Sequence, residues 1–151
     1  MPIQPTRRLV LGLAAGGVAI TLAPLPASAQ LAAPTQAAVD RIRGSRALQQ
    51  GRVTLRAPNI AENGNAVPLN ISVESPMTPT DHVKAIYVFA DKNPTPEVAT
   101  FHLTAAMGRA SADTRIRLGQ TQDVIAIAEM SDGALFMARA EVKVTIGGCG
   151  G

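Results

Sequence analysis

The sequence VPLNISVE, residues 67–74, places an aliphatic side chain at every second position. Its odd-numbered positions hold valine, leucine and isoleucine, and its even-numbered positions hold proline, asparagine, serine and glutamate. Successive side chains of a β-strand point to opposite faces of the sheet, so a period of two indicates a strand with one buried face. This segment therefore predicts a sheet that packs one side against a core.

Further segments with the same alternation, or with a more uniformly apolar character, lie on both sides of this strand. The predicted strands are residues 53–55, 67–74, 83–90, 98–104, 110–118, 123–130 and 134–146. In the last of them, Val142, Val144 and Ile146 should share one face. Seven or eight short strands with turn signals between them, such as Asn63-Gly64, predict an all-β, immunoglobulin-like β-sandwich. The single cysteine and the absence of tryptophan exclude the usual disulfide and tryptophan of that core.

Residues 35–49 predict a short helix before the first strand, because apolar residues recur there at helical spacing. Thr35 is the expected N-cap, and Gly44 interrupts the apolar stripe. The stripe consists of Ala38, Val39, Ile42 and Leu48. Residues 30–146 are therefore expected to form one domain, a sandwich with an N-terminal helix.

Residues 1–29 have the pattern of a cleaved twin-arginine export signal. The pair Arg7-Arg8 precedes a weakly apolar run, and Ala27-Ser28-Ala29 fits a signal-peptidase site with cleavage after Ala29. A transmembrane anchor is the alternative, but the apolar run has 17 residues and is broken by glycine and proline, whereas a span needs about 20. The expected location is the periplasm, reached by the twin-arginine route, with no membrane attachment after cleavage.

The charge of the mature chain gives no sign of a nucleic-acid partner. Cleavage would remove two arginines and leave 12 basic and 11 acidic residues, a net charge of +1. Nucleic-acid binding proteins concentrate positive charge, and single-strand binders add aromatic stacking platforms. Only four aromatic residues are present.

Cys149 is the only cysteine, and two glycines flank it on each side. Exported cysteines are usually paired, so a single one is free, bonded to another molecule, or used chemically. A buried, inert role is excluded because the neighbouring glycines provide no apolar cover. Residues 147–151 therefore predict a flexible, thin arm that reaches at most about 17 Å. The glycines of this arm are Gly147, Gly148, Gly150 and Gly151.

Nothing near Cys149 in the sequence indicates a catalytic or metal-binding role. A nucleophilic thiol needs a base or cation to lower its pKa, yet the nearest cation, Lys143, is six residues away. His82 and His102 fall in or beside predicted strands and have no metal-ligand spacing with the cysteine. We therefore expect no catalytic residue, no metal and no cofactor, and a thiol that other proteins modify.

The terminal Gly-Gly-Cys-Gly-Gly, together with the export signal and a β-rich domain of about 120 residues, resembles the SoxY family. Members of this family are the sulfur-carrier subunits of the thiosulfate-oxidising multienzyme system. The internal run APNIAENGNAVP, residues 57–68, is also similar to the family's hallmark segment.

The resemblance implies a set of partners and a role for Cys149. It implies a heterodimer with SoxZ, and attachment of thiosulfate to Cys149 by the haem protein SoxAX. The hydrolase SoxB would then release sulfate, and the dehydrogenase SoxCD, where present, would oxidise the remaining sulfur. SoxZ is expected to cross the membrane bound to this chain.

Two other interpretations remain open at this point. A ubiquitin-like sulfur carrier also ends in Gly-Gly, but it uses the terminal carboxylate, requires ATP and stays in the cytoplasm. An exported structural module could instead dimerise through a Cys149 disulfide. Prenylation does not fit, because it needs a cysteine fourth from the end.

Overall fold

The computed structural model describes residues 30–147. Contacts divide the chain into residues 1–30 and residues 31–151, and the fold below belongs to the second unit. The predicted signal, with Arg7, Arg8 and Ala29, lies outside the described residues. Among the helices that the structure does describe, none has the length and apolar character needed to cross a membrane.

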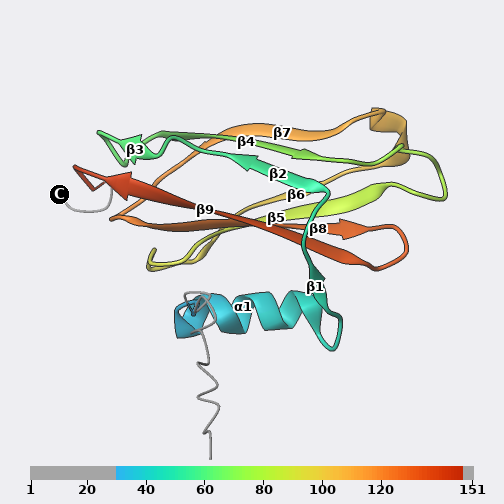
Figure 1. Ribbon diagram of the computed structural model, residues 1–151, viewed down its shortest axis with the longest axis horizontal. Coiled ribbons are helices and arrows are strands. Elements are labelled where there is room, and N and C mark those ends of the chain that lie inside the picture. Colours follow the sequence, from blue (N-terminus) through green and yellow to red (C-terminus); the bar gives the residue numbers. More distant parts are fainter. Residues whose placement is uncertain (1–29, 148–151) are drawn as a thin grey trace, which may run out of the picture. The chain divides into compact units, whose positions relative to one another are not determined.

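Two β-sheets pack face to face, and one helix covers the outer side of the larger sheet (Figure 1). The larger sheet has the order β1-β9-β8-β5-β6, with β3 also paired to β9, and the smaller has the order β2-β4-β7. In chain order, the helices and strands of the whole fold are α1 (Ala33–Arg43), β1 (Leu48–Gln49), β2 (Val53–Arg56), β3 (Ile60–Ala61), β4 (Val67–Val73), β5 (Val83–Ala90), β6 (Glu97–His102), the 3₁₀ helix η1 (Ala105–Met107), β7 (Ala110–Ile116), β8 (Gln122–Met130) and β9 (Leu135–Val144). The predicted immunoglobulin-like sandwich with a short N-terminal helix is confirmed.

The main core lies between the two sheets. The aliphatic residues of β4 all point into it, as the alternation predicts, and Ile71 is completely buried. In β7, Ile116 faces the same core, and Leu118 beyond the strand is also buried, while Arg115 and Arg117 are exposed. The alternation of apolar and polar residues in the strands of the smaller sheet therefore indicates one buried and one solvated face.

A second, smaller core lies between α1 and the outer face of the larger sheet. Ala38 and Val39 of the helix pack there against a group of fully buried side chains from β5, β8 and β9. This group consists of Phe89, Ile125, Ile127 and Leu135. Because β5 and β8 are covered on both faces, their sequences are apolar runs rather than alternating ones.

The helix begins and ends earlier than predicted, and Thr35 is not its N-cap. Pro34 occupies the first turn, and Gly44, with a φ of 56°, ends the helix. Thr35 is buried, and its hydroxyl donates to the backbone carbonyl of Asp91 at 3.0 Å, while the Asp91 carboxylate accepts from the Ala32 amide at 2.8 Å. Leu48, placed by the prediction on the helix, belongs to β1.

The last strand is also shorter than predicted. It ends at Val144, and Ile146 is 67% exposed although Val142 is fully buried. The extrapolated alternation fails because the Ile146 carbonyl accepts a hydrogen bond from the Gly64 amide, which turns the chain out of the strand. The strands β1 and β3 were not predicted, since two residues are too few to show a period.

Candidate functional site at the end of β9

The internal run at residues 57–68 lies against the C-terminal end of β9 (Figure 1). β3 runs parallel to β9 there, with Ile60 opposite Lys143. The Lys143 amide donates to the Asn59 carbonyl at 3.0 Å, and the Thr145 amide donates to the Ala61 carbonyl at 3.1 Å. The internal run that carries part of the resemblance therefore meets residues 143–146, which come directly before the glycine tail, at one end of the sandwich.

Residues 59–64, which we call the base loop, join three segments through Gly64. The Gly64 amide donates to the Ile146 carbonyl at 2.7 Å, and its own carbonyl accepts from the Leu118 amide at 2.8 Å. The Asn63 side chain accepts from the Asn65 amide at 2.9 Å, which stabilises the turn locally. The asparagine–glycine pair thus forms a turn whose backbone fixes the last residues before the glycine tail.

Gly147 is the one tail glycine that the structure describes, and it lies directly against another backbone segment. A β-carbon built on Gly147 would overlap the carbonyl oxygen of Gly119. A glycine is therefore required here for close approach, a role that its position in the tail did not reveal. The remaining predicted site residues Gly148, Cys149, Gly150 and Gly151 lie outside the described residues.

A network of amide side chains fixes the segment that contains Gly119. The Asn93 carboxamide accepts from the Gly119 amide at 3.1 Å and donates to the Arg117 carbonyl at 2.7 Å. Gln122, only 2% exposed, donates to Asn93 at 2.9 Å and accepts from the Lys92 amide at 2.7 Å. Because the buried Gln122 and the partly exposed Asn93 are bonded to each other and to the backbone, the loop that abuts Gly147 is held in one position.

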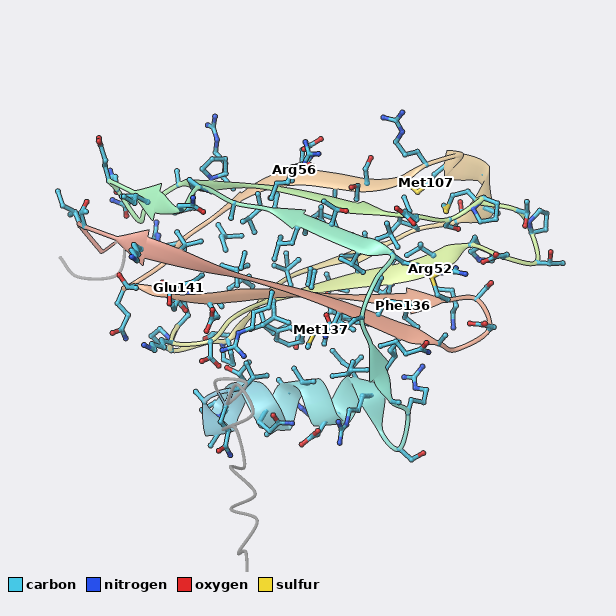
Figure 2. All side chains as sticks on the ribbon, in the orientation of Figure 1. Arg52, Arg56, Met107, Phe136, Met137 and Glu141 are labelled. Atoms are coloured by element: carbon cyan, nitrogen blue, oxygen red, sulfur yellow. The ribbon has the colours of Figure 1, made fainter. Side chains whose placement is uncertain are left out.

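The side chains around this end are mostly exposed, in contrast to its bonded backbone. Ile60 is 59% exposed, and a surface hollow beside it is lined by Asn59, Ala140, Glu141 and Lys143. Glu141 points outward at the edge of the sheet (Figure 2). The base of the tail is thus accessible to a second protein.

The two histidines lie at the opposite end of the sandwich. The His82 amide donates to the Ser131 hydroxyl in the turn before β9, and His102 ends the edge strand β6 opposite Ala85. The structure therefore does not bring either histidine to the C-terminal end of β9. Within residues 30–147, no group of three or more His, Cys, Asp or Glu side chains is arranged to hold a metal ion.

Comparison with known proteins identifies the family. The model of the family described as sulfur oxidation protein SoxY matches residues 39–149, a range that contains the base loop, Gly147 and Cys149. The chain belongs to the SoxY family. It is 30% identical to the solved sulfur carrier protein SoxY from Chlorobium limicola f thiosulfatophilum, with a TM-score of 0.61. That match covers 74% of this chain and 96% of the Chlorobium chain, and it supports a role for this chain in sulfur oxidation.

More distant solved structures share only the fold. A superoxide reductase (neelaredoxin) from Ignicoccus hospitalis is 17% identical, covers 62% of this chain and 80% of its own, and has a TM-score of 0.55. A superoxide reductase-like protein from Thermotoga maritima is 18% identical, covers 64% of this chain and 93% of its own, and also has a TM-score of 0.55. No curated protein sequence matches this chain.

Proposed function

We propose that this chain carries the sulfur intermediates of thiosulfate oxidation as covalent adducts of Cys149. The observation that supports this most is the extent of the family match, which continues through Cys149, the only cysteine of the chain. The base loop and Gly119 fix the backbone two residues before this cysteine. The folded domain therefore fixes the start of the tail whose thiol the partner enzymes modify.

The loading step is an oxidation. The thiol sulfur of Cys149 bonds to the sulfane sulfur of thiosulfate, giving an S-thiosulfonate. The thiol proton is released to solvent, and two electrons pass to an oxidant, here the haem protein SoxAX. This chain supplies the attacking sulfur, and SoxAX accepts the electrons.

The following steps occur while the sulfane sulfur stays bonded to Cys149. Water, activated by SoxB, attacks the sulfone sulfur and breaks the bond to the sulfane sulfur, which leaves a persulfide on Cys149 and releases sulfate and a proton. SoxCD then oxidises the persulfide sulfur where that enzyme is present. The chain itself is a substrate of each enzyme and not a catalyst, and it holds no cofactor apart from the sulfur adduct.

Location and permanent partner follow from the same proposal. The chain crosses the membrane folded through the twin-arginine route, loses residues 1–29, and works in the periplasm as a heterodimer with SoxZ. Because SoxZ crosses while bound, deletion of residues 1–29 is expected to leave both proteins in the cytoplasm. Normal export of SoxZ beside the shortened chain would contradict the shared route.

Labelled thiosulfate tests the function directly. The SoxZ heterodimer is incubated with SoxAX and thiosulfate radiolabelled in either its sulfane or its sulfone sulfur, and SoxB is then added. Both labels should join the wild-type chain, and SoxB should release only the sulfone label. A Cys149→Ser chain should take up neither label.

The result also separates the two alternative functions. Equal labelling of the Cys149→Ser chain would indicate a carboxylate carrier of the ubiquitin-like kind and contradict the proposal. A wild-type chain that forms only a Cys149 disulfide dimer, with no bound label, would support the structural module instead.

A further inference from the structure

A row of arginines follows the outer face of the smaller sheet. Ala110, Ile116 and Leu118 are buried, so the odd-numbered positions between and beside them point away from the core. These positions are Arg109, Ser111, Asp113, Arg115 and Arg117. Arg56 of β2 lies on the same face, on the side of the sandwich opposite to α1 (Figure 2).

We call Arg56, Arg109, Arg115 and Arg117, together with Asp113, the arginine strip. None of its four arginines forms an ion pair within residues 30–147. Its aspartate accepts a hydrogen bond from Asn70 on the neighbouring strand. The strip has a formal charge of +3, whereas the chain without residues 1–29 carries +1, so its remaining charges sum to −2.

The positive charges elsewhere in the fold are mostly neutralised. On the larger sheet, Glu129 pairs with Arg46 at 2.9 Å and with Lys84 at 3.9 Å, and Arg139 pairs with Asp123. Arg43 on the helix pairs with Asp40 at 3.2 Å. Arg41, Lys92 and Lys143 also form no ion pair within residues 30–147, but they lie on separate segments, whereas the strip gathers four such arginines on one face.

One end of the strip, Arg117, lies close in sequence to Gly119, the residue beside the first glycine of the tail. Arg117 is two residues before Gly119, whose carbonyl abuts Gly147. The Arg117 carbonyl accepts from Asn93, whose side chain also accepts from the Gly119 amide, so the end of the strip and the neighbour of Gly147 share one network. A molecule bound on the strip therefore lies beside the point where the tail leaves the domain.

The length of the strip indicates the kind of ligand. From Arg109 to Arg117 the strand rises about 27 Å, far more than a sulfate or thiosulfate ion can span but similar to the width of a standard protein interface. Arg56 and Arg115 also border a hollow over Pro68 and Asn70 that is open to solvent. This geometry fits an extended protein surface rather than a small oxoanion.

The chemistry of the strip indicates a transient partner. Permanent interfaces are rich in apolar side chains at their centre, whereas charged residues are depleted there. The strip instead offers exposed guanidinium groups, which steer association and pair with carboxylates. We propose that the strip is the surface on which an acidic patch of a sulfur-transferring enzyme docks while it receives Cys149, an inference that rests on the proposed carrier function.

Charge reversal tests the docking surface. The rate of thiosulfate loading on the SoxZ heterodimer by SoxAX is measured against carrier concentration at several NaCl concentrations. The double variant Arg115→Glu with Arg117→Glu is compared with Arg41→Glu, which reverses an exposed charge on α1 that forms no ion pair with the described part of the chain. For the double variant, kcat/KM of loading should be at least tenfold lower than for wild type at low salt, mainly because KM rises. The kcat/KM of the double variant should also depend less on salt than that of wild type. Arg41→Glu should behave as wild type.

Three outcomes would overturn the inference. The first is an equal kcat/KM for the double variant and Arg41→Glu. The second is a wild-type loading rate that does not depend on salt. The third is stronger inhibition of loading by sulfate than by NaCl at the same ionic strength. The last would indicate a small-anion site. Thermal unfolding of the double variant at the wild-type temperature shows that it is folded. In each of these outcomes Cys149 is still loaded, whereas failure of the carrier function would leave even the wild type unlabelled.

Discussion

The two ends of β9 are each joined to a very short parallel strand, but they are held in different ways. At its first residues, Leu135 lies opposite Leu48 of β1 and is fully buried in the core under α1. At its last residues, Lys143 lies opposite Ile60 of β3, and both side chains are exposed. The first end is held by apolar packing, and the second by backbone hydrogen bonds and by the close approach of Gly147 to Gly119.

Polar contacts reinforce the first end as well. Arg46, just after the helix, donates to the Gly133 carbonyl at 3.0 Å and to Glu129 at 2.9 Å, and Glu129 also accepts from the Tyr87 hydroxyl at 3.0 Å. Burial tends to raise the pKa of Glu129, but the hydrogen bonds from Arg46 and Tyr87, together with the positive charges of Arg46 and Lys84, outweigh it, so the pKa lies below that of an ordinary glutamate.

This difference separates stability from function along one strand. Side chains at the first end are committed to packing and cannot change without loss of stability. At the second end Val142 and Ala61 face the core, but Ile60 and Lys143 are exposed and contribute little to packing. These exposed side chains are therefore free to contact another protein, and the chain is fixed at Gly147 through its backbone.

The largest expected effect is the loss of packing at the first end. Leu135→Ala should lower the free energy of unfolding by about 2–5 kcal/mol, because it leaves a cavity under the helix. The matched change at the second end, Ile60→Ala, should cost about 0.5 kcal/mol or less. Urea unfolding of both variants measures the contrast, and similar losses for the two would show that the ends are held alike.

An intermediate effect is expected at Gly147. Gly147→Ala should displace either residue 147 or Gly119, because the added carbon meets a backbone oxygen. The hydrogen bond between the Gly64 amide and the Ile146 carbonyl should weaken, and the Gly64 amide should exchange about tenfold faster. Amide hydrogen exchange followed by NMR tests this.

The control for this variant is Gly108→Ala after η1. Gly108 has a φ of 68° and open space around its α-carbon. Its substitution should strain only the local backbone and leave Gly64 protected. Unchanged exchange in Gly147→Ala would mean that the tail is not fixed at Gly119.

The smallest expected effect is the pH dependence contributed by Glu129. A glutamate whose pKa is lowered by folding stabilises the native state above its unfolded pKa of about 4.3, and this contribution is lost as the pH falls through the folded value. Glu129→Gln should therefore melt at a lower temperature than wild type near neutral pH. The difference should shrink below about pH 4, and a difference that grows in acid would contradict the sign.

The sequence was informative where a strand is long and has one solvated face. β4 and β7 alternate over their whole length, so their faces and the sandwich could be predicted. The extension of the last strand to Ile146 was wrong, because the alternation continues past the point where Gly64 binds the chain. The assignment of Thr35 as a cap was wrong because the partner of its hydroxyl, Asp91, is distant in the sequence.

The site could be predicted in part. The tail motif and the run at residues 57–68 both pointed to the SoxY family, which the comparison confirms. The contact of residues 59–64 with the end of β9 could not be predicted, because the pairing of β3 with β9 depends on the order of the strands in space rather than on any local pattern. The steric requirement at Gly147 was hidden for the same reason, since Gly119 belongs to another loop.

The most direct test of the account is the mass of the C-terminal peptide that contains Cys149, from protein purified without reductant from cells oxidising thiosulfate. The account predicts a mixture of the free thiol with sulfane and thiosulfonate adducts on Cys149, and loss of these adducts after reduction. A peptide found only as the free thiol or as a disulfide-linked dimer throughout active thiosulfate oxidation would contradict it.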